Sequence, residues 1–438
     1  MNNIIDEIPA APPSPHFESK PTSRPIQWLS ILQLAFSILV ASNLFPLAAF
    51  LLARGLRNWI SQGKPGGATS DFLFAVGLVL CGLLLLPSAY FALLNLIDRP
   101  IPVVLNRSPA FWRVAILILV LFVLPASLVI GGLVVRNPKF TWMILPFMHV
   151  LATGIPILFV VSIGLRGFTM DSPRRLWGLF GAGLALGPLL IFLIESLFVV
   201  AVIVLVIIYV SSQPSLVADL SRLVTRLRFS SPSQEELVLI LQPYLTNPAV
   251  VFSLFSILAG LIPLIEEILK PVGMVFLIGR SMTPSQGFSA GILSGAGYAL
   301  CESIFRVGPG SEWLTITIAR SGTGAIHILA TGLVGLGLAY AWGQGKYLRL
   351  GILLITAMSI HGLWNALSLL SSAAVLLPAG QANTYGLIGF LANASPYGLV
   401  IESLVCIVLI GWINLMLRKR GELHGLDSAS GSNLPASG

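Results

Sequence analysis

Two adjacent glutamates and a lysine stand inside a long apolar stretch of this sequence. Lys270 follows Glu266 by four residues and Glu267 by three, so on a helix one ammonium group can reach both carboxylates. Two neighbouring carboxylates in a medium of low dielectric constant cannot both ionise cheaply, so one ionised base and one protonated acid are expected. A structural ion cluster is the alternative, but two carboxylates and one lysine leave a residual negative charge.

A third glutamate ends another apolar stretch, which is rich in small residues. Gly291, Gly295 and Ala299 precede Glu302 at helical spacing, and small residues let helices in a membrane approach closely. We expect this packing to bring Glu302 against a neighbouring helix. Pairing with Arg306, four residues further on, is the structural alternative.

Two histidines follow in the next two apolar stretches. Arg320 and His327 are seven residues apart and share one helix face, and the small or polar residues 321–324 between them leave room for water. His361 and Asn365 are four residues apart, and an imidazole and a carboxamide on one face supply donors to a developing oxyanion. Gly362 leaves room for a substrate backbone. A single histidine is commonly structural, but here three glutamates accompany it.

The composition decides which kind of protein carries these groups. Of the 438 residues 56% are hydrophobic and 10% are charged, against about 25% charged in soluble domains. This excludes a soluble enzyme, a nucleic-acid-binding module and a disordered protein, and it makes each charge within an apolar stretch informative. The formal net charge of +8 reflects Lys and Arg between apolar stretches, where they set membrane topology. We expect the lipid bilayer as a partner and no nucleic acid.

The apolar stretches predict an all-α polytopic membrane protein with about ten transmembrane helices and a short amphipathic interfacial segment. A span needs about 20 apolar residues. The candidates are Trp28–Ala53, Phe72–Ile97, Val114–Val135, Thr141–Leu165, Leu176–Tyr209, Ala249–Gly279, Gly287–Phe305, Leu314–Trp342, Leu348–Leu370 and Tyr397–Leu417. The fifth is long enough for one kinked helix or a broken pair. Five carboxylates fall inside these stretches: Glu195, Glu266, Glu267, Glu302 and Glu402.

The same pattern predicts the domain organisation. Residues 1–26 form a disordered tail, 27–211 an N-terminal transmembrane bundle, 212–248 two interfacial amphipathic helices or a simple linker, 249–417 the C-terminal catalytic bundle, and 418–438 a second disordered tail. Basic residues 418–420 close the last span, whereas residues 371–396 contain no Lys or Arg. Because cytoplasmic loops carry the excess of positive charge, we expect a cytoplasmic C-terminus in a prokaryotic cell membrane.

The ordered motifs in residues 258–370 resemble those of the PrsW family of intramembrane proteases. That family belongs with the CAAX-prenyl endopeptidases among glutamate-dependent membrane proteases. The matching pieces are Glu-Glu-x-x-Lys at 266–270, the small-residue helix ending in Glu302, the Arg and His of 320–327, and His-Gly-Leu-Trp-Asn at 361–365. The corresponding helix of the family usually ends in a Glu-Asn pair. In this sequence Ser303 follows Glu302, so no asparagine takes that place.

The resemblance implies hydrolysis of a peptide bond in a membrane-anchored protein, without a cofactor. Glu266 would activate water, with His327 helping to hold it. Glu267, Lys270 and Arg320 would tune the ionisation of the catalytic groups, and Glu302 would orient His327. His361 and Asn365 would stabilise the oxyanion. Whether Glu266 or Glu267 is the base stays open at this point.

Three other interpretations remain. A zinc-dependent protease would use His327, His361, Glu266 and Glu302 as ligands, although no His-Glu-x-x-His motif occurs and the resemblance favours a metal-free mechanism. A proton-coupled transporter also uses intramembrane carboxylates and histidines, and Pro263 would suit a broken helix. A non-catalytic membrane scaffold is the third. The absence of Gly-x-Ser-x-Gly excludes a serine nucleophile of that type.

Overall fold

The protein is a bundle of long helices. A computed structural model describes residues 27–431 apart from short stretches at 63–64, 101–109, 169–171, 231–235, 237–238, 241–246, 278–281, 309 and 377–385. Among the residues so described every regular element is a helix. Ten helical segments there are long and apolar enough to cross a membrane. The polytopic all-α fold predicted from the sequence is therefore confirmed.

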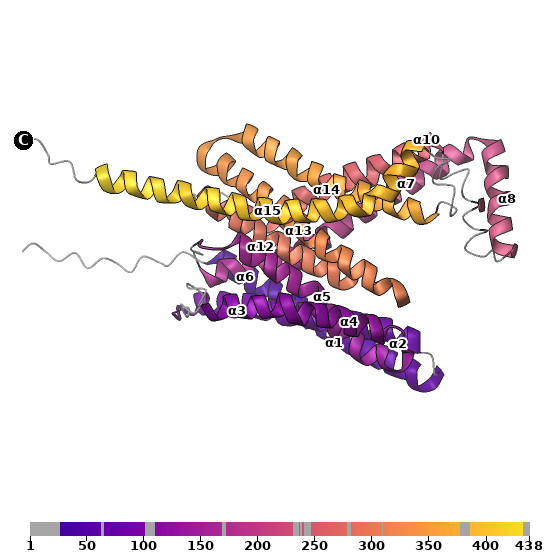
Figure 1. The fold of residues 1–438 in the computed structure, drawn as a ribbon, viewed down its shortest axis with the longest axis horizontal. Helices are drawn as coiled ribbons and strands as arrows, with labels where there is room; N and C mark the ends of the chain where they lie inside the picture. Colours follow the sequence, from indigo (N-terminus) through magenta and orange to yellow (C-terminus); the bar gives the residue numbers. More distant parts are fainter. Residues whose placement is uncertain are drawn as a thin grey trace, which may run out of the picture.

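The ten segments alternate in direction along the chain (Figure 1). They comprise α1 (Trp28–Gln62), α2 (Pro65–Leu96), α3, η1 and α4 (Ala110–Ile118, Leu119–Val123, Leu124–Val134), α5 (Pro138–Gly164), α6, η2 and α7 (Pro173–Gly181, Ala182–Leu186, Gly187–Ser211), α10, η3, α11 and η4 (Pro248–Phe255, Ser256–Leu261, Ile262–Leu269, Lys270–Leu277), α12 (Pro284–Phe305), α13 (Trp313–Gln344), α14 (Tyr347–Leu376) and α15 (Gly386–Gly431). Two shorter helices, α8 (Pro214–Ser230) and η5 (Gly310–Glu312), lie between them.

Helices α12 and α13 form the buried centre of the bundle. A Cβ atom built on Gly291 would lie 2.3 Å from the carbonyl oxygen of Thr331, and one on Gly287 would lie 2.5 Å from that of Gly335. On the other side of α12, a Cβ on Gly183 of η2 would lie 2.0 Å from the carbonyl oxygen of Ser294. Backbones this close leave no room for a side chain. The predicted close approach of the small-residue helix α12 is thus present. This packing fixes the position of Glu302 in its last turn.

Helix α11, which carries the paired glutamates, is bounded by two irregular helical segments. The π-helical segment η3 precedes it, and the 3-10 segment η4 follows it with Pro271 at φ −81° and ψ 16°. Proline cannot donate a backbone hydrogen bond, so the helix tightens and bends there. The carbonyl oxygen of Lys270 instead accepts a 2.6 Å hydrogen bond from Ser294 Oγ of α12. The two irregular segments therefore set α11 in its own orientation against the central helices.

One side of the molecule collects the starts of α1 and α6 and the later part of α15. The Nη1 atom of Arg174, in the first turn of α6, donates to Ser30 Oγ near the start of α1 at 2.6 Å. Gly167 lies against the Arg418 side chain of α15. Helix α8 lies at the opposite side and runs across the direction of the long helices (Figure 1). This is the orientation expected of an interfacial helix, and its location at the membrane surface stays a prediction.

Of the two alternatives for the long fifth stretch, the single helix is the one present, because α6, η2 and α7 form one continuous helix with a π-helical turn at 182–186. One sequence expectation is corrected. Helix α15 continues to Gly431, so residues 418–431 are helical where a disordered tail was expected. No proline interrupts this stretch before Pro435, which allows the helix to propagate. The predicted tail 1–26 and much of the second predicted interfacial helix lie outside the described residues.

Candidate active site

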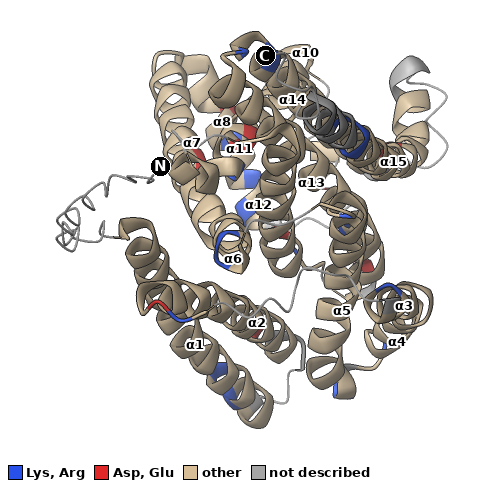
Figure 2. Cartoon of the chain, turned by 90° about the vertical axis from the view of Figure 1, so that its left-hand side faces the viewer, with Lys and Arg blue, Asp and Glu red and all other residues tan. Residues whose placement is uncertain are grey.

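The ionisable groups singled out in the sequence converge inside the bundle. Figure 2 shows charged residues gathered among α11, α12 and α13, within a surround of mostly uncharged helices. Glu266 and Glu267 come from α11, Lys270 from the start of η4 and Glu302 from the last turn of α12. Arg320 and His327 come from α13, and His361 and Asn365 from α14. The structure thus brings the sequence-predicted groups together from four successive spans.

The ammonium group of Lys270 occupies the centre of this cluster. Its Nζ atom lies 2.5 Å from Oε1 of Glu267 and 2.9 Å from Oε2 of Glu266. It also lies 2.9 Å from Nδ1 of His327 and 3.4 Å from Nδ1 of His361. The side chain of Lys270 has no exposed surface. A buried ammonium needs such compensation, so Lys270 acts as an internal cation that holds the two carboxylates and His327 together, with His361 beside it.

A second chain of contacts leads from His327 to α12. The Nη2 atom of Arg320 donates to Oε2 of Glu302 at 2.6 Å, and Nε2 of His327 lies 2.6 Å from the same oxygen. Because Lys270 can only donate, Nδ1 of His327 accepts from it, and the ring proton on Nε2 is then directed to Glu302. Both ring nitrogens of His327 are therefore used by protein groups. The expected alternative contact is present as well, with Nε of Arg306 3.3 Å from Oε1 of Glu302.

His361 reaches the paired glutamates from the opposite side. Its Nδ1 atom lies 2.9 Å from Oε1 of Glu267, and its Nε2 atom lies 3.8 Å from Oε2 of Glu266. In the neutral ring with the proton on Nδ1, that proton goes to Glu267 and the lone pair on Nε2 points towards Glu266. In this tautomer His361 is an acceptor at Nε2, and the oxyanion role expected from the sequence motif stays a prediction.

The rest of the His-Gly-Leu-Trp-Asn motif fits α14 against the π-helical segment η3. A Cβ on Gly362 would lie 2.3 Å from the carbonyl oxygen of Ala259, and Nδ2 of Asn365 donates to the carbonyl oxygen of Leu258 at 2.8 Å. The expectation that Gly362 makes room for a substrate backbone is corrected, because the space is filled by the backbone of η3. Asn365 thus binds a backbone carbonyl of the π-helical segment, and its second amide hydrogen remains for another acceptor.

Sequence reasoning missed Tyr298, a residue of α12 whose ring packs against the site. The Lys270 ammonium lies 4.6 Å from the centroid of this ring, and the ring meets His327 edge-on at a centroid distance of 5.1 Å. An ammonium over an aromatic face is attracted by the ring quadrupole. Tyr298 stands four residues before Glu302, on the same helix face, and that spacing is the signal that would have found it.

A cavity of about 650 Å³ opens beside the cluster. Its wall includes Glu266, Glu302, His327 and His361 at the inner end and Arg306 and Ser372 towards the outer end. Glu267 is not part of the wall and has no exposed surface. Arg320 also lines the cavity, and its buried Nε atom has no hydrogen-bond partner among the described residues. One of the paired glutamates therefore faces a space that can hold a substrate, and the other does not.

Four side chains of the cluster form a set of ligands that a divalent metal ion could use. Glu266, Glu267, His327 and His361 each offer one ligand atom, and these atoms lie within 4.8 Å of one another. Glu302, which we had included among the possible ligands, instead accepts from Arg320 and His327. Two histidines and two carboxylates are a donor set that suits zinc. The Lys270 ammonium, however, already lies 2.5 to 3.4 Å from an atom of each of the four residues, so the site as built does not fit a second cation.

Comparison with known families adds an independent finding. A family model described as PrsW family intramembrane metalloprotease matches residues 172–392, which is half of the chain. The chain belongs to the PrsW family. Among curated proteins and among solved structures no match is found.

The PrsW match and the predicted catalytic bundle have different bounds. It begins at residue 172, at the start of α6, whereas the sequence placed the start of the catalytic bundle at 249. Helix α7 packs against α11 and η4, so the first matched helix supports the segment that carries the glutamates. Helices α1 to α5 lie before the matched region. The protein is a multi-pass membrane protein of an intramembrane protease family.

Proposed function

We propose that this protein hydrolyses a peptide bond of a membrane-anchored protein with a water molecule activated by Glu266. The observation that carries the proposal is the different placement of the paired glutamates. Glu266 lies on the cavity wall beside Glu302, His327 and His361, while Glu267 is turned away and bound by Lys270 and His361. A general base must be within reach of the proton that it removes. Glu266 meets this condition and Glu267 does not.

The proposed reaction begins with water held between Glu266 and Nε2 of His361, whose nearest atoms are 3.8 Å apart. The Glu266 carboxylate takes one proton from this water, and the water oxygen forms a bond to the scissile carbonyl carbon. The carbonyl oxygen becomes an oxyanion. Glu266 then gives its proton to the amide nitrogen, the carbon–nitrogen bond breaks, and a carboxylic acid and an amine form. The acid passes its remaining proton to the amine, so a carboxylate and an ammonium group leave and Glu266 is again a carboxylate. We assign the contact with water to His361 because both nitrogens of His327 are already used.

Two donors on the cavity wall are available to the oxyanion. Nε of Arg320 is buried without a partner among the described residues, and Asn365 has an amide hydrogen beyond the one that it donates to Leu258. Donors fixed before the reaction stabilise a developing charge without reorganisation. Lys270 stays bound to Glu267 throughout the reaction, so that Glu266 alone of the pair exchanges a proton.

A zinc-dependent version of the reaction is the second candidate, favoured by the convergence of four donor atoms within 4.8 Å and by the family description. The central ammonium of Lys270 speaks against it, because like charges repel strongly in a medium of low dielectric constant.

The test uses the purified full chain in liposomes with a fluorogenic single-span substrate. We expect cleavage to survive exhaustive chelation, to be abolished in Glu266→Gln and His361→Ala, and to persist at a reduced rate in Glu267→Gln. Loss on chelation that Zn²⁺ restores would overturn the metal-free mechanism. Full activity of Glu266→Gln would overturn the choice of base.

A transport assay on the same liposomes separates the remaining alternatives. Cleavage without proton movement supports the protease, and Glu266→Ala and His327→Ala are expected to lose it while keeping the helical circular dichroism of the parent. Proton flux without cleavage of any membrane peptide would favour the transporter. Neither activity in well-folded protein would favour the scaffold.

A further inference from the structure

His149 of α5 is a buried histidine that the proposed reaction does not use. Its Nε2 atom lies 3.1 Å from the carbonyl oxygen of Ile304, and its Nδ1 atom lies 3.2 Å from Nε1 of Trp313. Because an indole N–H can only donate, Nδ1 of His149 accepts from it, and the ring proton on Nε2 then goes to the carbonyl oxygen of Ile304. Both nitrogens of this imidazole are therefore bound within the protein.

The two partners of His149 stand at the ends of two central helices. Ile304 belongs to the last turn of α12, where backbone carbonyl groups have no partner within the helix. Glu302 precedes it by two residues. Trp313 is the first residue of α13, and Arg320 follows it by seven residues, so both lie on one face of that helix. One imidazole thus joins the helix ends that carry Glu302 and Arg320.

Other N-terminal helices pack closely against the same two helix ends. A Cβ atom built on Gly77 of α2 would lie 2.4 Å from Cγ2 of Ile304. One built on Gly131 of α4 would lie 2.2 Å from the ring of Trp313, which is only 1% exposed. Three helices that precede the matched family region, α2, α4 and α5, therefore fix the end of α12 and the start of α13.

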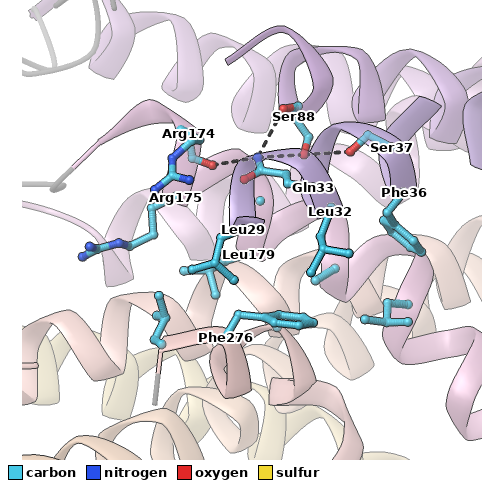
Figure 3. A pocket seen from close by; sticks show the side chains of 16 residues that line it. Leu29, Leu32, Gln33, Phe36, Ser37, Ser88, Arg174, Arg175, Leu179 and Phe276 are labelled. Carbon is cyan, nitrogen blue, oxygen red and sulfur yellow. Dashed lines mark hydrogen bonds between the residues drawn. The ribbon is translucent and has the colours of Figure 1, made fainter. Parts of the chain in front are cut away.

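A separate contact joins the N-terminal helices to the matched region at another place. Nε2 of Gln33 of α1 donates to Oγ of Ser88 of α2 at 3.1 Å and to the carbonyl oxygen of Arg174 of α6 at 3.0 Å (Figure 3). None of these three residues lines the cavity of the candidate active site. These hydrogen bonds join the same two parts of the protein, but they involve neither the end of α12 nor the start of α13.

We propose that His149 is a positioning residue, through which the N-terminal helices set the place of Glu302 against Arg320 and His327. The contacts of Glu302 Oε2 with Nη2 of Arg320 and Nε2 of His327 are both 2.6 Å, so a small shift of α12 against α13 lengthens them. A displacement of about 1 Å can lower a rate by about 10²-fold. The effect on cleavage rests on the proposed function, whereas the effect on the two helix ends does not.

The experiment compares two amide substitutions of His149 in the purified full chain. The amide nitrogen of glutamine can take the place of Nε2 and donate to Ile304, whereas the shorter asparagine reaches the place of Nδ1 and can only accept from Trp313. Each variant thus loses one of two hydrogen bonds. We expect His149→Gln to keep kcat within about fivefold of the parent, and His149→Asn to lower kcat by about tenfold or more at unchanged KM. A histidine that only fills the core predicts equal kcat in both.

Amide hydrogen exchange, followed by mass spectrometry, gives a reading that does not depend on cleavage. Without the bond to Ile304 the end of α12 opens more often, so the amides of residues 302–306 should exchange about tenfold or more faster in His149→Asn. In His149→Gln they should exchange as in the parent. If the parent cleaves no membrane peptide, the proposed function fails, and this measurement still decides the role of His149.

Gln33→Leu is the matched control, because it removes the other connection and leaves the contacts of His149 intact. It should lower the midpoint of thermal unfolding and leave both kcat and the exchange of residues 302–306 unchanged. Equal values for the two His149 variants in either measurement, or a loss of kcat in Gln33→Leu as large as in His149→Asn, would overturn the proposal.

A further variant keeps the test decisive if His149→Asn does not fold. Trp313→Phe lacks the indole N–H, as His149→Gln lacks its acceptor, and both keep the hydrogen bond to Ile304. Their exchange at residues 302–306 should match that of the parent. Faster exchange in both would show that this bond does not hold the end of α12, and would overturn the proposal.

Discussion

The Nζ atom of Lys270 lies 2.9 Å from Nδ1 of His327, and this contact joins two groups of charges into one network. On one side Lys270 binds the paired glutamates of α11. On the other side, His327 contacts Glu302, which Arg320 also binds. Two cations and three carboxylates are therefore linked across three spans. We expect a substitution at the Lys270 end of this network to affect the Glu302 end.

Replacing the central lysine should cost both stability and activity. In Lys270→Met the carboxylates of Glu266 and Glu267 lose their common partner, and breaking a buried ion pair costs about 3–5 kcal/mol. We expect a lower free energy of unfolding in detergent and no cleavage. The double variant Lys270→Met/Glu267→Gln removes one uncompensated charge and should recover part of the stability but none of the activity. Wild-type stability of the single variant would contradict the central role of Lys270.

The two arginines that contact Glu302 should differ sharply. Arg320 is buried, whereas the Arg306 side chain is 68% exposed, and exposed ion pairs contribute only about 0–1 kcal/mol. Arg320→Gln releases Glu302 and removes a possible oxyanion donor, so kcat should fall by about 10²-fold or more. Arg306→Gln should change it by less than about fivefold. Steady-state cleavage kinetics on both variants measure the difference, and equal losses would contradict it.

The glycine of the α14 motif should be intolerant of even one methyl group. In Gly362→Ala the new Cβ meets the carbonyl oxygen of Ala259, so α14 must move away from η3 and the Asn365–Leu258 hydrogen bond must lengthen. We expect reduced thermal stability and reduced cleavage. Gly351→Ala is the matched control on the same helix, because nothing lies within 4 Å of its new Cβ. Alanine favours the helix by about 1 kcal/mol, so this control should be neutral or stabilising.

One intramembrane carboxylate should be dispensable. Glu402 is buried in α15, and neither of its oxygens has a hydrogen-bond partner among the described residues. An unsatisfied buried polar group costs about 1–3 kcal/mol, so Glu402→Leu should raise the unfolding midpoint and leave cleavage unchanged. The same substitution at Glu302 should abolish cleavage. Loss of activity in Glu402→Leu would show that this carboxylate takes part in the reaction.

Much of the architecture follows from the sequence because a bilayer restricts the choices. Backbone groups in lipid must be satisfied within the segment, so apolar stretches of sufficient length become helices. The ten spans were predictable for this reason. The end of α15 was not, because a Gly- and Ser-containing stretch outside the bilayer has no such constraint. The single π-helical turn within the fifth span also leaves no clear mark in the residue pattern.

The sequence by itself determined the charged residues and the histidines of the candidate site, because an ionisable residue inside a span is costly and stands out, but it did not indicate Tyr298. Only the tertiary structure decided what each group contacts. Adjacent residues on a helix point about 100° apart, so Glu266 and Glu267 face different surroundings, and their neighbours come from α12, α13 and α14. The placement of Lys270 among the side chains of two glutamates and two histidines depends on how distant helices pack. So does the backbone of η3 that fills the space beside Gly362. No local spacing contains that information.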